Sequence, residues 1–588
     1  MLLPILQERL QAAVASALPD ADLSRVLVRP CTNATHGDYE TTALMGLAKE
    51  RKMNPRQLAT DVQARLDVAD ICEPVQISGA GFLNFRIRSE TLGRVIASAA
   101  RGDHLFVVKT TRPRTVVIDF SSPNVAKPLH VGHIRSTFLG DCLARVFRTL
   151  GHRVVTDNHI GDWGTQFGML LVGWSDHLDT AALAADPIAE MERLYKLVNA
   201  RCKEDPSVRD RARSELVKLQ SGDPENLAIW REMQRLSQVQ FDNLYTRLGV
   251  QFDVTLGESF YNPKLAGVVA ELEAAGIARA SEGAVAVFSD GTLPTKEDPL
   301  LINRDGEWQA NPFLVRKSDG GFNYATTDLA TLEHRFNTWA PDEILYITGG
   351  PQQLHFRQLF QTYRRWRPGF TARLEHVWFG SILGSDGTPF KTRSGETVKL
   401  NDLLLEAEER AFVIVAGKNP DLPEAEQHEI ARRIGIGALK YADLLPNRQS
   451  DYVFSWDKLL ALTGNTAPYL QYAYTRTRSL QRKGGERPDL ASLPDSLPLV
   501  AREELELARH LLNFGFTLEA VTSDYRPNFL CNYLYELAGR FSQFWENCPV
   551  LKAEDPATRT ARAALCEVTS RVLGTGLNIL GIETVERM

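Results

Sequence analysis

The string TVVIDFSSPNVAKPLHVGHIRSTFLGDCLARVFRTLGHRVVT occupies residues 115–156 and decides the fold of the region around it. Its β-branched start, Thr115–Phe120, predicts a buried strand. A helix is predicted next, because apolar residues recur on one helical face: Ile134, Phe138, Cys142, Val146 and Leu150. Gly151 ends that helix, and Arg153–Thr156 begins a second strand. This order is typical of a doubly wound parallel sheet, whose functional loops follow the carboxyl ends of its strands.

Two histidines, His130 and His133, flank Gly132 at the predicted start of this helix. Their spacing places both imidazoles on one side of the first turn. Three interpretations are open: metal ligands, caps of the helix, or donors to phosphate in an adenylyl-transfer site. No cysteine or carboxylate nearby completes a metal set. Gly132 would allow close approach of a ligand, and free N–H groups at a helix start favour phosphate.

The longer strings around the histidine pair carry a family resemblance. Residues 122–133 (SPNVAKPLHVGH) and 161–168 (GDWGTQFG) resemble the active-site core of the arginyl-tRNA synthetases, and the pair matches the HIGH signature of class I synthetases. The resemblance implies a Rossmann-like catalytic domain that ligates L-arginine to tRNA(Arg) at the expense of ATP. It also implies an arginine site that includes Asp119, Ser122, Pro123, Asn124 and His133.

Length and composition limit the class of protein. The 588 residues have room for about three or four domains, and 44% hydrophobic with 24% charged residues is typical of a soluble globular protein. With a net charge of −6, nucleic acid would be held by local basic patches. Seven scattered cysteines, without C-x-x-C, fit a reducing compartment and argue against structural zinc. We expect a cytoplasmic monomer with no membrane contact and no permanently bound cofactor.

Three domains are expected along the chain. Residues 1–105 form an α+β unit, with a charged helix over Lys49–Leu66 and a hairpin over Val75–Ile87. Residues 106–440 form the catalytic domain, with a helical insertion near 179–250, and residues 441–588 form an all-α domain. The resemblance covers nearly the whole chain. It implies that the first domain is a tRNA-binding accessory domain, in which exposed Asn84 and Phe85 contact tRNA; ordinary packing is the alternative.

A phenol and a carboxylate share one face of a second predicted helix. Tyr324 and Asp328 are four residues apart, and such a pair suits the planar donors of a guanidinium. A hydrogen bond within the helix is the alternative. The resemblance places the side chain of arginine here, with Glu258 as a further carboxylate and Gln352 orienting the amino acid.

A glycine pair follows the predicted buried strand Ile344–Thr348. Gly349 and Gly350 stand at its carboxyl end, where an adenosine could lie against bare backbone. The predicted ATP site therefore combines this pair with the residues around the HIGH signature, which are Lys127, His130, Gly132 and His133.

The second signature of class I synthetases, KMSKS, is degenerate in this chain. Pro389 and Thr392 stand where its two lysines would be. Adenylyl transfer needs cationic charge near the departing pyrophosphate. Lys127 can supply that charge from the opposite side, beside Mg²⁺ that accompanies ATP, and a solvated lysine is the alternative. Lys391 and Arg393 remain on the loop as partial substitutes, so the predicted catalytic set is Lys127, His130, His133, Lys391 and Arg393.

Aromatic and basic residues share one predicted helix near the start of the third domain: Tyr469, Tyr472, Arg476 and Arg478. Aromatic rings stack on unpaired bases, and arginines hold phosphates. Half-buried tyrosines with exposed arginines are the plainer interpretation. The resemblance implies that this is an anticodon-binding domain.

These features together predict arginine–tRNA ligation. The arginine carboxylate attacks the α-phosphorus of ATP, and the arginyl group passes to the terminal 2′-hydroxyl of tRNA. The resemblance implies that activation needs bound tRNA. Two rivals remain: a non-catalytic RNA-binding paralogue, favoured by the degenerate KMSKS, and a small-molecule adenylyltransferase, which would have no use for the helical tail.

Overall fold

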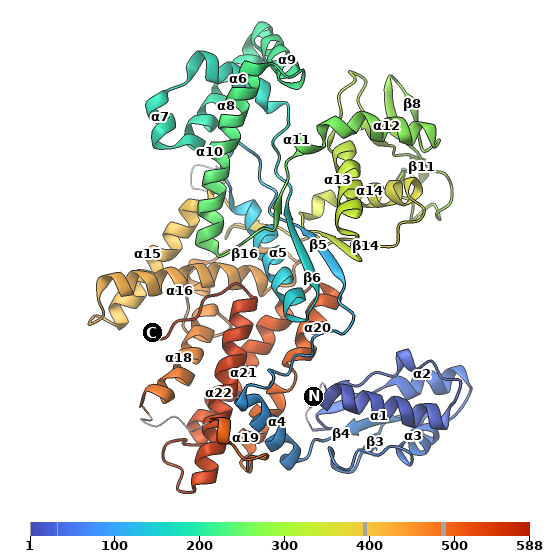
Figure 1. The fold of residues 1–588 in the computed structure, drawn as a ribbon, viewed down its shortest axis with the longest axis vertical. Coiled ribbons are helices and arrows are strands. Elements are labelled where there is room, and N and C mark those ends of the chain that lie inside the picture. Colours follow the sequence, from blue (N-terminus) through green and yellow to red (C-terminus); the bar gives the residue numbers. More distant parts are fainter. Residues whose placement is uncertain (1, 32, 34, 392–396, 484–489) are drawn as a thin grey trace.

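A five-stranded parallel sheet lies at the centre of the computed structural model, which describes residues 2–588 except 32, 34, 392–396 and 484–489 (Figure 1). Its order is β14-β13-β5-β6-β7. The strand order reverses between β5 and β13, and doubly wound sheets bind ligands at such a switch point. The predicted Rossmann-like sheet is confirmed, and its strands are β5 (Thr115–Asp119), β6 (Arg153–Asn158), β7 (Val254–Thr255), β13 (Glu343–Tyr346) and β14 (Arg373–His376).

Helix α5 (Val131–Thr149) connects β5 to β6 and packs on the sheet. All five apolar residues of its predicted face are buried. Gly140 permits the close approach, because a Cβ at this position would lie 2.1 Å from Cγ of Phe120. The backbone turns away from the helix at Gly151, which has a φ of +88°.

The insertion is helical, as predicted, and its helices pack with α6 (Gln166–His177) into one group (Figure 1). Trp230 ties this group to the GDWGTQFG string, since its Nε1 donates to the carbonyl of Asp162 at 2.9 Å. The helices of the insertion are α7 (Thr180–Ala185), α8 (Pro187–Glu204), α9 (Pro206–Gln220) and α10 (Pro224–Leu248).

Residues 258–339 and 350–366 form a second group of helices and short strands. In Figure 1 this group lies above the sheet, on the side away from α6–α10. Its helices are α11 (Glu258–Tyr261), η2 (Asn262–Lys264), α12 (Leu265–Ala274), α13 (Tyr324–Trp339), η3 (Gly350–Gln352) and α14 (Gln353–Trp366). Its strands are β8 (Ala278–Ser281), β9 (Ala284–Val287), β10 (Leu301–Arg304), β11 (Glu307–Ala310) and β12 (Phe313–Arg316).

The N-terminal unit is an antiparallel sheet, order β1-β2-β4-β3, covered by helices. The hairpin is confirmed, but the single helix predicted over Lys49–Leu66 is wrong. Asn54 caps a new helix whose first residue is Pro55, and the residue before a proline disfavours helix. The elements are α1 (Leu2–Ala17), η1 (Leu23–Arg25), β1 (Arg29–Pro30), β2 (Tyr39–Thr41), α2 (Ala43–Glu50), α3 (Pro55–Gln63), β3 (Gln76–Ser78), β4 (Phe82–Phe85) and α4 (Ser89–Arg101).

The C-terminal part is a helical bundle. The boundary expected after residue 440 falls inside α16, and α4, expected in the first domain, packs on α19 and α22 of this bundle. Within the described residues, no helix is both long and apolar enough to cross a bilayer. The elements are β15 (Ile382–Leu383), α15 (Leu400–Lys418), α16 (Glu424–Leu444), β16 (Tyr452–Val453), α17 (Trp456–Leu459), α18 (Ala467–Lys483), η4 (Leu490–Ser492), α19 (Arg502–Leu511), α20 (Phe514–Asp524), α21 (Asn528–Asn547) and α22 (Pro556–Ile579).

Candidate active site at the sheet switch point

The two histidines cap helix α5 with their own rings. Nδ1 of His130 accepts from the amide of Gly132 at 3.1 Å, and Nδ1 of His133 accepts from the amide of His130 at 3.1 Å. The ring centroids are 4.1 Å apart, which confirms that the imidazoles share one side of the turn. A Cβ on Gly132 would lie 2.8 Å from Cε1 of His130, so this glycine makes room for the capping ring.

The expectation of free amides at the start of α5 is wrong. The amide of Val131 donates to the carbonyl of Val398 at 2.9 Å, and the amide of His133 donates to the carbonyl of His130 at 2.8 Å. Together with the cap on Gly132, these bonds occupy the first three N–H groups of the helix. Any phosphate at this point must therefore be met by side chains and by the helix dipole.

The surroundings of both histidine rings favour the neutral imidazole. Burial lowers the pKa of His133 to about 3, and burial together with Lys127 lowers the pKa of His130. Because each Nδ1 accepts a backbone N–H, the proton of each ring is assigned to Nε2. The site thus presents two neighbouring Nε2–H donors without a net positive charge.

The loop after β5 is held in an unusual conformation. Ser121, Ser122 and Ala126 have φ values of 72°, 49° and 62°, which non-glycine residues rarely adopt. Ser122 donates through Oγ to Asp119 at 2.9 Å. The Asn124 side chain lies against Gly161, where a Cβ would be 2.3 Å from its Oδ1. Strained residues of this kind cluster at ligand sites, and this loop stands at the switch point.

A fully buried arginine, which the sequence analysis did not identify, lies beneath this loop. The guanidinium of Arg335 on α13 contacts Asp119 at 2.7 Å and Asp157 at 2.9 Å. Burial alone would lower the pKa of Arg335, but the two carboxylates raise it well above its usual value. One Asp119 oxygen binds Arg335 while the other accepts from Ser122, so Asp119 supports the loop. Arg335 therefore joins α13 to β5 and β6.

Carboxylates and aromatic rings gather at the start of α13. Asp328 and Tyr324 both contact His355, the third residue of α14: Nε2 of His355 is 2.6 Å from Oδ2 of Asp328, and its ring centroid is 4.8 Å from that of Tyr324. Burial raises the pKa of Glu258, and the charge of Asp328 adds to the rise. The amide of Glu258 donates to Ile160, beside the GDWGTQFG string. Glu258 thus lies within the electrostatic field of Asp328, as it does within that of Asp162, and His355 is a residue that the sequence analysis missed.

The glycine pair after β13 lies half-buried at the same edge of the sheet. The amide of Gly350 donates to the carbonyl of Phe379 at 2.9 Å, and a Cβ on it would lie 3.3 Å from Trp378. Gln352 is exposed at the end of η3, directly before α14.

The cations near the histidines come from two segments. Nζ of Lys127 lies 5.4 Å from the ring centroid of Tyr195 on α8, and Lys127 lines a cavity of about 260 Å³ together with Arg247 and Lys399. Lys399 was not predicted, but it pairs with His130 through a backbone bridge. Lys391 is exposed, and Arg393 lies outside the described residues.

The expected exposure of Asn84 and Phe85 is wrong. Phe85 is fully buried and Asn84 is 4% exposed. Side chains of a strand alternate between its faces, so Phe85 points into the core of the unit. The Nδ2 atom of Asn84 donates to Oγ of Ser78 at 2.7 Å within the hairpin. Neither side chain offers a free surface to RNA in this conformation.

On α18 the four predicted RNA-binding residues differ in their surroundings. Tyr472 is 42% exposed, while Tyr469 is half-buried against Tyr535. Arg476 lies over the ring of Tyr472, and Arg478 forms an ion pair with Glu586 at 3.4 Å. The half-buried position of Tyr469 fits the plainer interpretation, and RNA binding by these four residues stays a prediction.

Comparisons with known proteins agree with this geometry. Residues 95–456 match the class I (R) tRNA synthetase catalytic domain, residues 470–588 the DALR anticodon-binding domain, and residues 4–87 the arginyl-tRNA synthetase N-terminal domain. The chain is 43% identical to the arginine–tRNA ligases of Cellvibrio japonicus and of Salmonella typhimurium strain SL1344, in each case over 99% of both chains. It is similar to the crystal structure of Plasmodium falciparum arginyl-tRNA synthetase, with a TM-score of 0.82, 26% identity, and coverage of 100% of this chain and 99% of the other. The chain belongs to the class I arginyl-tRNA synthetases.

Proposed function

We propose specific roles for the residues at the switch point in the ligation of arginine to tRNA that defines this family. The guanidinium of arginine lies between Asp328, Glu258 and Tyr324, and its α-amino and carboxylate groups lie at Ser122–Asn124. Gln352 orients the amino acid. Asp119 contributes indirectly, by accepting a hydrogen bond from Ser122 and so holding Ser122 in place. The assignment is carried by the position of Asp328 near the start of α13, where it contacts His355, and by that of Glu258, whose amide donates to Ile160 and whose carboxyl lies within the electrostatic field of Asp328.

ATP lies over the start of α5, with its adenosine against Gly349 and Gly350. The Nε2–H groups of His130 and His133 donate to phosphate oxygens on which charge grows in the transition state. Because both rings are held by backbone amides, they need little reorganisation when the reaction occurs. Mg²⁺ enters as part of MgATP, since Mg²⁺ is usually bound through substrate phosphates and water.

Selectivity against lysine follows from the shape of the cation. A guanidinium presents parallel donors that match a carboxylate, whereas an ammonium is a point charge. Lysine would leave acceptors of Asp328 and Glu258 unpaired in a half-buried site, which is costly.

The cation that offsets the degenerate KMSKS is Lys127, assisted by Lys399. In support, Lys127 is close enough to depress the pKa of His130, and the backbone of Lys399 is bridged to His130. Lys391 and Arg393 act as partial substitutes for the missing lysines at the pyrophosphate.

Replacing Lys127 by alanine is expected to lower the rate of ATP–pyrophosphate exchange by about 10²-fold, since one preorganised donor is worth roughly that amount. The affinity for tRNA should change less than twofold. Lys203→Ala, at an exposed position on α8, is the matched control and should leave exchange unchanged. Equal exchange rates in the two variants would place the essential cation elsewhere.

We infer further that activation requires bound tRNA, that the arginyl group is transferred to the terminal 2′-hydroxyl, and that the enzyme acts as a cytoplasmic monomer. Tyr472 and Arg476 would contact the anticodon loop. These inferences rest on family membership. Pyrophosphate exchange at full rate without tRNA would contradict the first of them.

A further inference from the structure

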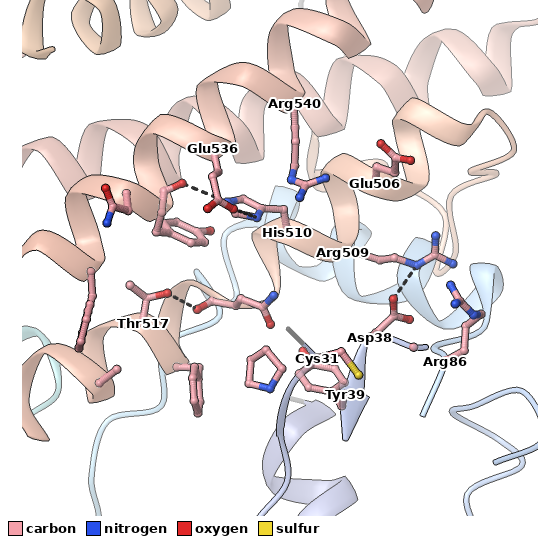
Figure 2. A pocket seen from close by; sticks show the side chains of 18 of the residues that line it. Cys31, Asp38, Tyr39, Arg86, Glu506, Arg509, His510, Thr517, Glu536 and Arg540 are labelled. Carbon is pink, nitrogen blue, oxygen red and sulfur yellow. Dashed lines mark hydrogen bonds and ion pairs between the residues drawn. The ribbon is translucent and has the colours of Figure 1, made fainter. Parts of the chain in front are cut away.

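A second cavity, of about 790 Å³, lies between the N-terminal unit and the C-terminal helices (Figure 2). Asp38 and Tyr39 form one wall, and residues of α19, α20 and α21 form the other. Its volume falls within the range of about 300–1,000 Å³ that small-molecule sites occupy. None of its lining residues belongs to the site at the sheet edge.

Three arginines on the C-terminal side of this cavity differ in the ion pairs that they form with the described residues. Arg509 forms an ion pair with Asp38 at 3.0 Å, and Arg502 pairs with Glu506 at 2.6 Å. Arg540 on α21 lines the same cavity, and in the part of the chain that the structure describes no carboxylate forms an ion pair with it. Its buried Nε lacks a hydrogen-bond acceptor. Figure 2 shows Arg540 extending from its helix toward His510. A guanidinium in this position is suited to an anion such as phosphate.

Hydrogen-bond acceptors line the same cavity as this cation. Nε2 of His510 is 3.0 Å from the carbonyl of Tyr533, to which it donates, and burial lowers the pKa of His510 to about 4. Its Nδ1 is therefore an unprotonated acceptor, and Oε2 of Glu536 lies 3.9 Å away. Oδ1 of Asn513 is also buried without a partner. Oδ1 of Asn513 can therefore accept an N–H group of a ligand, and the carboxylate of Glu536, whose side chain is 59% exposed, can do the same.

Apolar surface completes the cavity. Phe516 and Phe529 are half-buried side chains that line it, and their rings offer contact to a planar group. The cavity thus combines the guanidinium of Arg540, the acceptors of Asn513 and Glu536, and aromatic faces.

We propose that this cavity binds a nucleotide, with its phosphate on Arg540 and an amine-bearing base against Phe516 and Phe529. The amine faces Glu536 and Asn513. The nucleotide is either a free mononucleotide or an unpaired residue of bound RNA, and only the second source rests on the proposed function. In both cases the ligand joins the N-terminal unit to the helical bundle.

The test is a titration of the full-length protein with GMP and with UMP, which lacks an exocyclic amine, at saturating ATP so that the catalytic site is filled. GMP should bind more tightly than UMP. Arg540→Gln should weaken GMP binding by about tenfold or more, since it removes a charge-assisted contact. Glu536→Gln should reduce the preference for GMP. Arg502→Gln is the matched control, because its side chain is 84% exposed and already paired, and it should change binding less than twofold.

A parallel measurement of tRNA affinity distinguishes the two sources. Loss of GMP binding in Arg540→Gln with unchanged tRNA affinity identifies a free nucleotide. Weaker tRNA binding in Arg540→Gln but not in Arg502→Gln identifies a residue of the RNA. If neither affinity changes, or if Arg502→Gln reproduces every loss, the proposal is overturned. The rate of arginylation at saturating tRNA should stay normal in Arg540→Gln, so failure here is distinct from failure of the catalytic roles.

Discussion

Asp328→Ala is expected to lower kcat/KM for arginine by roughly 30- to 4,000-fold, while the affinity for ATP changes less than twofold. Removing one partner of a buried, hydrogen-bonded charge pair costs about 2–5 kcal/mol, and each 1.4 kcal/mol is a factor of ten. Asp328 is suited to such a pair because its side chain is 20% exposed and lies within the field of Glu258. The Oδ2 atom of Asp328 lies 2.6 Å from Nε2 of His355.

The measurement is ATP–pyrophosphate exchange with tRNA present, over a range of arginine and ATP concentrations. Asp319→Ala is the matched control, since Asp319 lies on an exposed turn shortly before α13. Asp328→Asn keeps the shape and removes the charge, so it should lose most of the same activity. An unchanged kcat/KM for arginine in Asp328→Ala would refute the assignment of the guanidinium pocket.

Arg335→Met is expected to lower the melting temperature by about 6–20 °C. The variant leaves Asp119 and Asp157 buried without their cation, and breaking a buried ion pair from one side costs about 3–5 kcal/mol. Both carboxylates contact Arg335 within 3.0 Å, and Arg335 itself is fully buried. Arginylation should also fall, because Asp119 would no longer hold Ser122 in place.

Thermal unfolding followed by circular dichroism tests this expectation. Arg364→Met, at an exposed position of α14, is the control and should melt like the unaltered protein. Adding Asp157→Asn to Arg335→Met should recover part of the lost stability, because it removes one uncompensated charge. If Arg335→Met and Arg364→Met melt at the same temperature, the buried cation does not support the switch point.

Much of the fold could be predicted because its elements have strong local periodicity. The five-residue apolar face of α5 and the β-branched run of β5 depend only on neighbours in sequence. The single helix predicted over Lys49–Leu66 is wrong because its apolar pattern continues across Asn54 and Pro55. At that point the cap formed by Asn54 and the geometry of Pro55 start a new helix. The predicted exposure of Phe85 is wrong because exposure depends on which face of the hairpin packs against the helices. The local sequence does not determine that face.

The candidate site was predictable where residues lie close together in the chain, as in the string around His130. Arg335 and His355 escaped notice because their partners are distant in sequence, and a charged residue on a helix is usually solvated. The sequence does contain a signal that Arg335 is buried. It follows Leu332 by three residues, which places it on the same buried face of α13. The cavity beside Arg540 was not predictable either, because it forms only when two separate parts of the chain meet.

The most direct test of the arginine pocket is tRNA-dependent ATP–pyrophosphate exchange with arginine, lysine and citrulline, the last of which replaces the guanidinium by a neutral urea of nearly the same shape. If Asp328 and Glu258 hold the guanidinium as proposed, recognition requires both a positive charge and a forked set of donors. Exchange is therefore expected with arginine alone, and lysine and citrulline should each be at least about 10²-fold poorer in kcat/KM. Use of citrulline or lysine within tenfold of arginine would contradict recognition by these two carboxylates.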